Sequence, residues 1–222
     1  MIHFLRALQF ADGQFPSGGF AFSWGVESLM ADGHITRADW PVFLAGQIEH
    51  RWAPHDRPLV AYAFQAAQDF AALIALDQLT NALAIITAAR EGSLRAGAAL
   101  LSTHARLGTP GAAAYRALVT SGEAHGHLPV ITGLVLAGAG LDLPTALAVS
   151  AHTTAQSLGT AAVRLGLIGA LDAQTALQNI QPRVAELIAS PLPPLDDIGS
   201  FTPLTDIAMM RHPFQAQQLF SN

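Results

Sequence analysis

Histidine is the residue type in this sequence best suited to hold a metal, and there are nine histidines. His125 and His127 flank a glycine, whereas His50 and His55 are five residues apart and so do not share a helix face. No pair has the His-x-x-x-His or His-Glu-x-x-His spacing. Because a tight site needs three or four converging ligands, the sequence predicts no metal site. His125 and His127 are the best candidates for a weak or transient metal contact.

Residues for covalent or phosphate chemistry are absent or out of context. The chain has no cysteine and all eleven basic residues are arginine, so it has no thiolate, Schiff-base lysine or Walker-type phosphate loop. Asp196-Asp197 resembles the acidic motif of helical prenyl-diphosphate enzymes, but Ser200 stands where a third aspartate is needed. Ser17 follows no strand and lacks the nucleophile-elbow pattern. We therefore predict no catalytic residue, no cofactor and no enzymatic activity.

The composition is typical of a helical protein with apolar surface to spare. Of 222 residues, 51% are hydrophobic and 12% charged, and β-branched runs are few. The net charge of −5 and the lack of a basic run argue against a nucleic-acid partner. The charge-free stretches 124–141 and 143–163 contain histidine and proline, so we interpret them as buried helices and not membrane spans. No targeting signal is visible, which favours a cytoplasmic location.

Turn residues and helical periodicity divide the chain into helices. Ser23 is the expected N-cap of a helix that follows a turn-rich loop, and Pro54 and Pro58 bracket an expected break. Further helices are expected from Thr36 and over 59–70, 71–83, 85–107, 128–140, 144–169 and 172–189, with a short one after the turn at 108–111. The sequence thus predicts an all-α fold. Residues 1–190 form one domain, a bundle of about eight to ten helices with terminal arms.

Residues 191–222 differ in character from the rest of the chain. The run Ser190–Pro194 breaks any helix, and the residues after it mix proline, aspartate and isolated apolar groups. This segment is too apolar for an ordinary disordered end and too short to build its own core. Its apolar side chains must therefore be covered by the bundle or by a partner, and we favour the partner. The prediction is a C-terminal partner-docking tail that is mobile in the free protein.

The loop from Pro16 to Glu27 combines glycines with aromatic side chains. We expect a positive φ at Gly18 or Gly19, so that Gly19→Val lowers expression or solubility. Glu27 falls in the first turns of the following helix, where the helix dipole favours a carboxylate. Two interpretations stay open: the aromatic side chains plug the core, or part of the cluster anchors a partner.

This stretch resembles the N-terminal signature of the urease accessory protein F family, Pro-x-Gly-Gly-Phe-x-x-Ser-x-Gly-Leu-Glu. The matching residues are Pro16, Gly18, Gly19, Phe20, Ser23, Gly25 and Glu27. Val26 replaces the usual leucine, and Phe22 stands where the family often has tyrosine.

The resemblance continues in the same order to the end of the chain. Residues 89–97 resemble the family's central arginine-bearing helix, and 127–133 resemble its His-x-Pro-Val-x-x-Gly segment. Residues 161–169, around Arg164, resemble Ala-x-Arg-Leu-x-Pro-Leu-Gly. Residues 203–207 and 211–221 resemble the C-terminus, except that Pro213 and Gln218 replace the usual Glu and Arg.

The resemblance implies an all-helical scaffold, without a catalytic centre, that helps to insert nickel into urease. Family members pair with the accessory D (or H) protein, recruit the nickel-carrying GTPase (accessory protein G), dock on apo-urease and tend to dimerise. On this basis the expected partner-binding residues are Phe20, Phe22, Trp24, Glu27, Arg211, His212, Gln215, Leu219 and Phe220. The expected structural residues are Pro16, Gly18, Gly19, Ser23, Gly25, Arg164, Pro203 and Asp206.

Two consequences follow for a protein of this kind. Because the chain lacks lysine and a phosphate-cradling loop, we expect that alone it neither binds GTP tightly nor hydrolyses it. Arg164 lies in an otherwise apolar helix, so we expect it to form an ion pair or cap a helix. Arg164→Ala is then expected to destabilise the fold and not to remove partner binding selectively.

Two other functions stay open. One is a helical cytosolic hydrolase or transferase that uses Glu or His in a central pocket. A polar pocket that holds a carboxyl group of raised pKa would favour it. The other is a stand-alone nickel-binding protein, which tight stoichiometric nickel binding by the isolated chain would favour. The sequence leaves the dimer interface, the route of nickel and the sign of the effect on the GTPase open.

Overall fold

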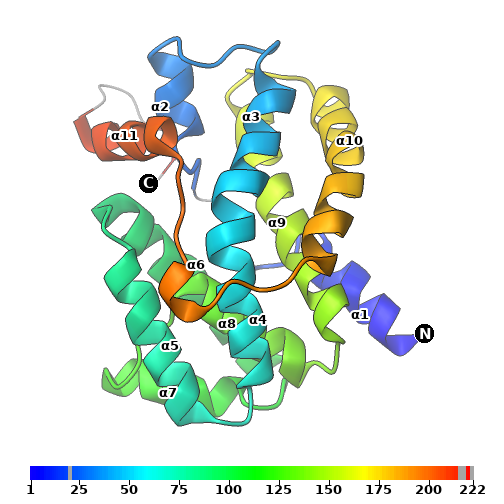
Figure 1. The fold of residues 1–222 in the computed structure, drawn as a ribbon, viewed down its shortest axis with the longest axis vertical. Coiled ribbons are helices and arrows are strands. Elements are labelled where there is room, and N and C mark those ends of the chain that lie inside the picture. Colours follow the sequence, from blue (N-terminus) through cyan, green and yellow to red (C-terminus); the bar gives the residue numbers. More distant parts are fainter. Residues whose placement is uncertain (20–21, 215–218, 221–222) are drawn as a thin grey trace.

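Three consecutive helical segments form one continuous rod through the middle of the molecule (Figure 1). In the computed structural model, which describes residues 1–19, 22–214 and 219–220, they are α3 (Trp40–Gln47), a π-helix (Ile48–Asp56) and α4 (Arg57–Gln65). Pro54 lies inside the π-helix, and Pro58 lies in the first turn of α4. The predicted break at these prolines is therefore wrong. The wider π-turn carries Pro54, and a first helical turn needs no N–H from Pro58.

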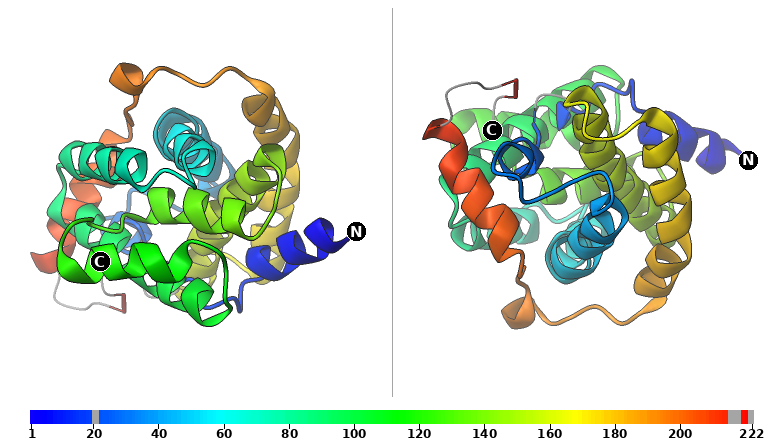
Figure 2. Two further views of the ribbon diagram at one scale, coloured as in Figure 1. Left: turned by 90° about the horizontal axis from the view of Figure 1, so that it is seen from below. Right: turned by 90° about the horizontal axis from the view of Figure 1, so that it is seen from above.

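The remaining helices surround this rod (Figure 2). They are α1 (Ile2–Ala11), α2 (Val26–Ala31), α5 (Phe70–Leu83), α6 (Thr87–Arg106), α7 (Ala112–Ser121), α8 (Leu128–Gly138), α9 (Leu143–Arg164), α10 (Ala170–Ala189) and α11 (Pro203–Arg211). The described residues contain no strand. The predicted all-α, single-domain bundle is confirmed.

Two adjoining apolar cores stabilise the bundle. One lies among α4 to α8, and the other lies among α2, α3, the π-helix, α9 and α10. Helix α8 passes so close to α4 that a Cβ atom at Gly133 would overlap the backbone at Val60 and Phe64. Residue 133 must therefore be glycine for the two helices to pack. No described helix has the length and apolar character needed to cross a membrane.

The start of α2 departs from the predicted N-cap. Trp24 has a φ of 52° and Gly25 a φ of 89°, so two successive residues adopt the left-handed conformation. Gly25 occupies the N-cap position and the helix begins at Val26, three residues after Ser23. The Ser23 hydroxyl still accepts a hydrogen bond from the Glu27 N–H (3.4 Å). A left-handed tryptophan is unusual, and such strain persists only where the surrounding structure enforces it.

The glycine that the loop requires is Gly18. Its φ is 79°, which confirms the predicted positive φ, and a Cβ atom there would lie 2.7 Å from the Ala99 Cβ. Gly19 has no positive φ, and the nearest atom to a Cβ there, the Ser157 hydroxyl, lies at 3.5 Å. The structure therefore predicts that substitution of Gly18, and not of Gly19, destabilises the fold.

Gly18→Ala is expected to lower the free energy of unfolding by more than about 1 kcal/mol, because it adds strain and a steric clash. Gly19→Ala is expected to change it by less than about 0.5 kcal/mol. Urea denaturation of the two variants measures the difference. Equal effects would show that the loop does not hold Gly18 in this conformation.

Candidate functional site

The C-terminal segment meets the start of α2 at Glu27, in the first turn of that helix. Its Oε2 accepts hydrogen bonds from His212 Nε2 (2.8 Å) and from the Phe220 N–H (3.3 Å). Its Oε1 accepts one from the Leu219 N–H (2.5 Å). Glu27 and His212 are both buried, so the carboxylate depends on these donors in place of water. We call Glu27, Arg164, His212, Leu219 and Phe220 the terminal junction.

Arg164 joins the terminal junction from the last turn of α9. Its guanidinium carbon lies 4.3 Å above the centre of the Phe220 ring, and the Phe220 side chain is buried. This is the geometry of a cation–π contact, which arginine makes well because its guanidinium is planar and weakly hydrated. The stabilising role expected for Arg164 stays a prediction. A salt bridge between Arg211 and Asp32 (2.9 Å) adds little, because Arg211 is mostly exposed.

The aromatic side chains of the N-terminal loop pack on α6 and on the π-helix. The rings of Phe22 and Trp24 are 5.3 Å apart. Arg95 lies over Phe22 at 5.0 Å and Arg51 lies over Trp24 at 5.2 Å. Phe22 is buried, and the Trp24 ring lies 3.1 Å from the position of a Cβ at Gly92. Phe22 therefore acts as a plug in this structure, as the first interpretation of the loop expects.

The other predicted structural residues hold the loop and the start of α11. The Pro16 carbonyl accepts a hydrogen bond from the Thr103 hydroxyl (2.8 Å), and the Gly19 carbonyl accepts one from Ser157 (3.4 Å). Pro203 is the first residue of α11. The Thr202 hydroxyl donates to Asp206 Oδ1 (3.2 Å), and burial raises the pKa of Asp206.

The structure brings most of the predicted partner-binding residues close together, but it uses several of them inside the molecule. Among those it describes, Phe22, Glu27, His212 and Phe220 are buried, and Trp24 is partly buried. Arg211 and Leu219 are exposed. Phe20 and Gln215 lie outside the described residues. A role in partner binding stays a prediction, and for the buried residues it requires the tail to leave the terminal junction.

Glu27→Ala is expected to loosen the tail, because the Leu219 and Phe220 amides and the His212 ring lose their common acceptor. Amide hydrogen exchange of His212, Leu219 and Phe220 is expected to accelerate by about tenfold or more. Glu49→Ala is the matched control, since Glu49 pairs with Arg183 (2.8 Å) on the outside of the π-helix. Unchanged exchange in Glu27→Ala would show that other contacts hold the tail.

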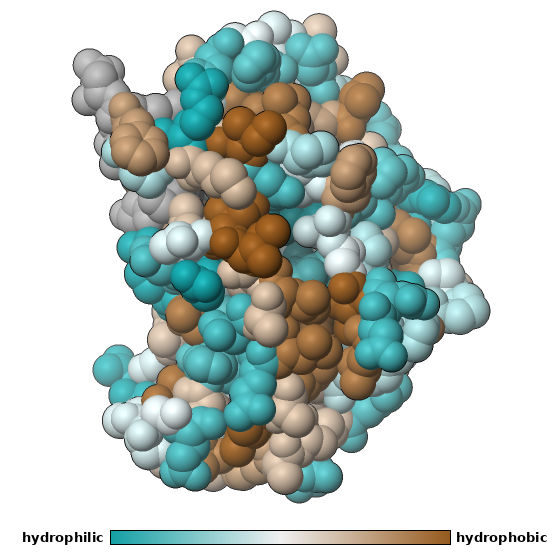
Figure 3. All heavy atoms as spheres, turned by 60° about the vertical axis from the view of Figure 1, so that its left-hand side comes forward, coloured by the Kyte–Doolittle hydropathy of each residue, from teal (hydrophilic) through white to brown (hydrophobic). Residues whose placement is uncertain are grey.

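Helix α11 presents apolar side chains to solvent. Leu204, Ile207 and Met210 recur every three residues and are each about half exposed. We call them the outer face of α11. A groove of about 420 Å³ lies between α11 and the start of α6, with Ile85 and Met210 among its walls. Figure 3 shows apolar side chains gathered along this side of the molecule. Such clustering is typical of an interaction surface.

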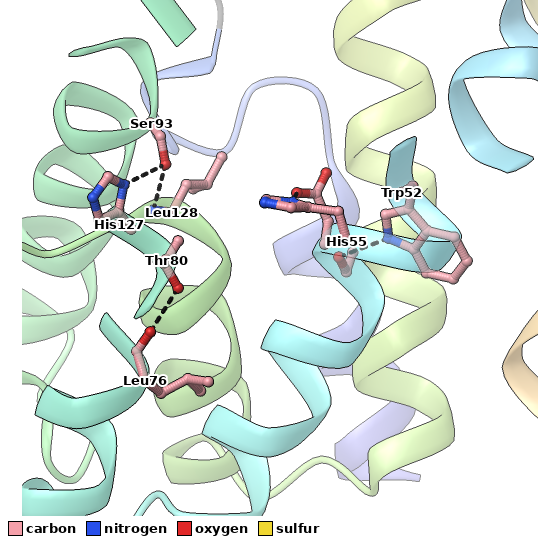
Figure 4. A network of polar contacts seen from close by, with 9 residues as sticks. Trp52, His55, Leu76, Thr80, Ser93, His127 and Leu128 are labelled. Atoms are coloured by element: carbon pink, nitrogen blue, oxygen red, sulfur yellow. Dashed lines mark hydrogen bonds and ion pairs between the residues drawn. The ribbon is translucent and has the colours of Figure 1, made fainter. Parts of the chain in front are cut away.

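An interior polar network tests the enzymatic alternative (Figure 4). The Ser93 hydroxyl lies 3.2 Å from His127 Nδ1, and Asn81 Oδ1 lies 3.2 Å from His127 Nε2. This order resembles a nucleophile, a base and an orienting group. Burial lowers the pKa of His127 to about 4, however, which makes it a weak base at neutral pH. The Ser93 hydroxyl also accepts the Leu128 N–H (3.1 Å) at the start of α8, so this network is best explained as structural.

A cavity of about 140 Å³ lies between α6, α8, α9 and the π-helix, and Asp56 is the carboxyl group in its wall. Burial alone would raise the pKa of Asp56. The hydrogen bond from His55 (2.8 Å) and the positive charges of His55 and Arg51 outweigh burial and lower the pKa. The carboxyl group of raised pKa, Asp206, is not in this wall. The cavity therefore lacks the feature that would favour an enzyme.

The described residues contain no group of three or more metal-binding side chains. The rings of His125 and His127 are 6.0 Å apart. Both ring nitrogens of His127 are already within hydrogen-bonding distance of Ser93 and Asn81. This geometry leaves His127 poorly placed even for the weak metal contact suggested by its spacing from His125.

One residue that sequence reasoning missed is Asp77, which is fully buried in α5. Its carboxylate accepts the backbone N–H groups of His125 and Gly126 (both 2.7 Å) and of His127 (2.9 Å). The Tyr115 hydroxyl donates a longer hydrogen bond (3.4 Å), and burial together with Asp77 raises the pKa of Tyr115. Asp77 thus fixes the turn from α7 into α8. The sequence did contain one indication of this role, since Asp77 is a single acidic residue within an apolar helical stretch.

Comparison with known proteins gives consistent matches over nearly the whole chain. The family model named UreF matches residues 36–181. The chain is 30% identical to a protein of Trichodesmium erythraeum over 98% of this chain and 96% of that protein. It is 31% identical to one of Agrobacterium fabrum over 97% and 95% of the two chains, respectively. For one of Paracoccus denitrificans the identity is 32% over 97% and 94%. Each of the three is named urease accessory protein UreF.

Proposed function

The chain belongs to the UreF family of urease accessory proteins, and we propose that it is a scaffold for the insertion of nickel into urease. In this proposal it binds the accessory D (or H) protein and recruits the nickel-carrying GTPase, accessory protein G, to apo-urease. It modulates the GTP-dependent delivery of nickel, which is cargo of the assembly and not a resident cofactor of this chain. It works in the cytoplasm as a homodimer.

The outer face of α11 is the observation that supports this proposal most directly. Leu204, Ile207 and Met210 lie half exposed on α11, near the end of the chain that resembles the family's C-terminus, and Met210 also lines the groove beside α6. Aliphatic and methionine side chains in such a cluster favour burial against a partner. Because each is already half buried, each gains about half of the roughly 1.5–3 kcal/mol of a fully exposed side chain. The neighbouring terminal junction depends on one carboxylate, so a partner can compete with it for the tail.

The absence of lysine supports a role in which this chain does not hydrolyse GTP and the partner GTPase does. Without a phosphate-binding loop, this chain is expected to show no GTP turnover when pure. GTP hydrolysis in the assembly then belongs to accessory protein G. Turnover by a preparation free of that GTPase would count against the scaffold role.

Co-purification tests the proposal. The tagged chain is produced together with the urease operon products, and the accessory D protein and the GTPase are expected to be recovered with it. Met210→Asp is expected to reduce recovery of the D protein at least tenfold, about 1.4 kcal/mol of binding free energy, with unchanged thermal melting. Deletion of residues 211–222 is expected to abolish the complex while the helical melt remains.

Val42→Asp is the matched control. Val42 is an exposed apolar residue on α3 (77% exposed, against 51% for Met210), and it lies outside the proposed surface. It should leave recovery of the D protein unchanged. Full recovery with Met210→Asp, or equal loss with both variants, would contradict docking at the outer face of α11.

A further inference from the structure

Residues 191–205, which we call the strap, lead from the end of α10 across the outside of the molecule and include the first turn of α11. Figures 1 and 2 show the strap, in orange, running from the end of α10 past the central rod to α11. Its proline-rich sequence suggests a loose linker. Its contacts do not fit that description, because Ile198 is buried in the first apolar core.

The strap is hydrogen-bonded to the rod along its length, and from Gly199 onward the partners run antiparallel to it. At its start, the buried Arg57 guanidinium donates to the carbonyls of Ser190 (2.9 Å) and Pro191 (3.0 Å). It also donates to Leu187 (2.7 Å) at the end of α10. The Tyr62 hydroxyl donates to the Pro193 carbonyl (2.9 Å). At the end of the strap, Gln47 donates from the rod to the Thr205 hydroxyl (2.8 Å).

Between these points the strap bonds to the backbone of the π-helix. The Gly199 N–H donates to the Pro54 carbonyl (3.3 Å), and the Phe201 N–H donates to the His50 carbonyl (2.9 Å). Pro54 has no N–H, so it cannot donate to a carbonyl of the preceding turn, and the helix is locally short of donors. The strap supplies two donors, the N–H groups of Gly199 and Phe201. The Phe201 side chain is mostly exposed, so this contact depends on the backbone.

Side chains of the same helical segment also form a wall of the interior cavity. Gln47, Arg51 and Asp56 all line that cavity, and Trp52 is held next to it by a hydrogen bond from its Nε1 to Ser150 (3.1 Å). The strap and the cavity therefore contact the same short segment, and Gln47 contacts both. A change in the hydrogen bonding of residues 50–54 must reach the cavity wall, because π- and α-helical pairing place these side chains differently.

We propose that the strap is a fixed part of the bundle that holds the π-helix in register and thereby sets the Arg51–Asp56 wall of the cavity. Only the segment after Thr205 is then free to leave with a partner, with a hinge at Thr202–Thr205. Beyond that point the tail is held by the buried side chains of Ala208 and Met209 on α11. Glu27 and Asp32 add side-chain contacts to His212 and Arg211. The inference does not depend on the proposed function.

Hydrogen exchange of the full-length protein tests where the hinge lies. The amides of Gly199 and Phe201 are expected to exchange as slowly as those of α4, while the amides of Leu219 and Phe220 exchange much sooner. Exchange of Gly199 and Phe201 at the rate of Leu219 would overturn the proposal, since the strap would then open together with the tail.

A matched pair of variants tests the coupling to the π-helix. Phe201→Pro removes the N–H that donates to His50, whereas Phe201→Ala shortens the same exposed side chain and keeps the N–H. The indole N–H resonance of Trp52 is expected to shift in Phe201→Pro and to stay in place in Phe201→Ala, with the Trp40 resonance unchanged in both. A Trp52 resonance that stays in place in both, or moves equally, would overturn the coupling. If Phe201→Pro does not fold, the exchange experiment on the unaltered chain still decides the proposal.

Discussion

Asp77→Ala is expected to lower the free energy of unfolding by about 3–5 kcal/mol, enough to threaten a domain whose total stability is about 5–15 kcal/mol. The substitution leaves the N–H groups of residues 125–127 without an acceptor in a buried turn. Each such donor costs about 1–3 kcal/mol when it is left unsatisfied away from water. The turn positions α8, a helix at the centre of the first apolar core, so the loss should appear as global unfolding in urea.

Asp69→Ala provides the matched control, because Asp69 accepts one backbone N–H, that of Ala72 (3.1 Å), at the exposed start of α5. Loss of a single cap of this kind costs about 1 kcal/mol. Asp77→Asn keeps one carbonyl oxygen and is expected to fall between the two alanine variants. Equal destabilisation by Asp77→Ala and Asp69→Ala would show that the buried turn obtains its acceptors elsewhere.

The folded protein is expected to lose stability as the pH falls from 6.5 to 4, in part through His104. Burial lowers the pKa of His104 to about 4, from an ordinary value of 6.5. Between pH 6.5 and 4, His104 therefore binds a proton in the unfolded chain but not in the folded chain. The contribution is fully present above pH 6.5, and it is lost as the pH falls through the folded pKa. It amounts to about 3 kcal/mol over these 2.5 units.

Urea unfolding at a series of pH values measures this contribution. His104→Gln is expected to be less stable near neutral pH, because it disturbs the contact of His104 Nδ1 with Thr109 (2.9 Å), but to have a shallower slope between pH 6.5 and 4. Burial also lowers the pKa of His127 to about 4, so part of the slope should remain. His34→Gln changes an exposed histidine and should retain the full slope. An unchanged slope in His104→Gln would refute the assignment.

Apolar periodicity predicted the helical fold well, because it reports directly on which faces are buried. It failed at Pro54, since proline usually ends a helix and no simple spacing announces a π-turn that carries one. The predicted N-cap at Ser23 was also wrong. Trp24 and Gly25 adopt the left-handed conformation after it, so the helix begins at Val26. In both places, contacts with residues distant in the sequence determine the backbone conformation, and the local sequence preference does not.

The residues of the terminal junction were identified from family resemblance, but the bonds among them could not be. Glu27 and His212 are far apart in the sequence, and no motif around either residue predicts that the two form a hydrogen bond. Asp77 and Arg57 were missed for the same reason. Each is a polar residue whose hydrogen-bond partners belong to a different helix or turn, so their burial becomes visible only when the helices are assembled.

The position of Glu27 near one end of the chain has a consequence for biosynthesis. Its hydrogen-bond donors follow it by 185 to 193 residues. At a translation rate of about 5–20 residues per second, the carboxylate waits roughly 10–40 s before His212 is even made. During that time the nascent helices must keep Glu27 in contact with water, because a buried and unpaired charge would be too costly. Every molecule therefore passes through a form with the terminal junction open before it first closes.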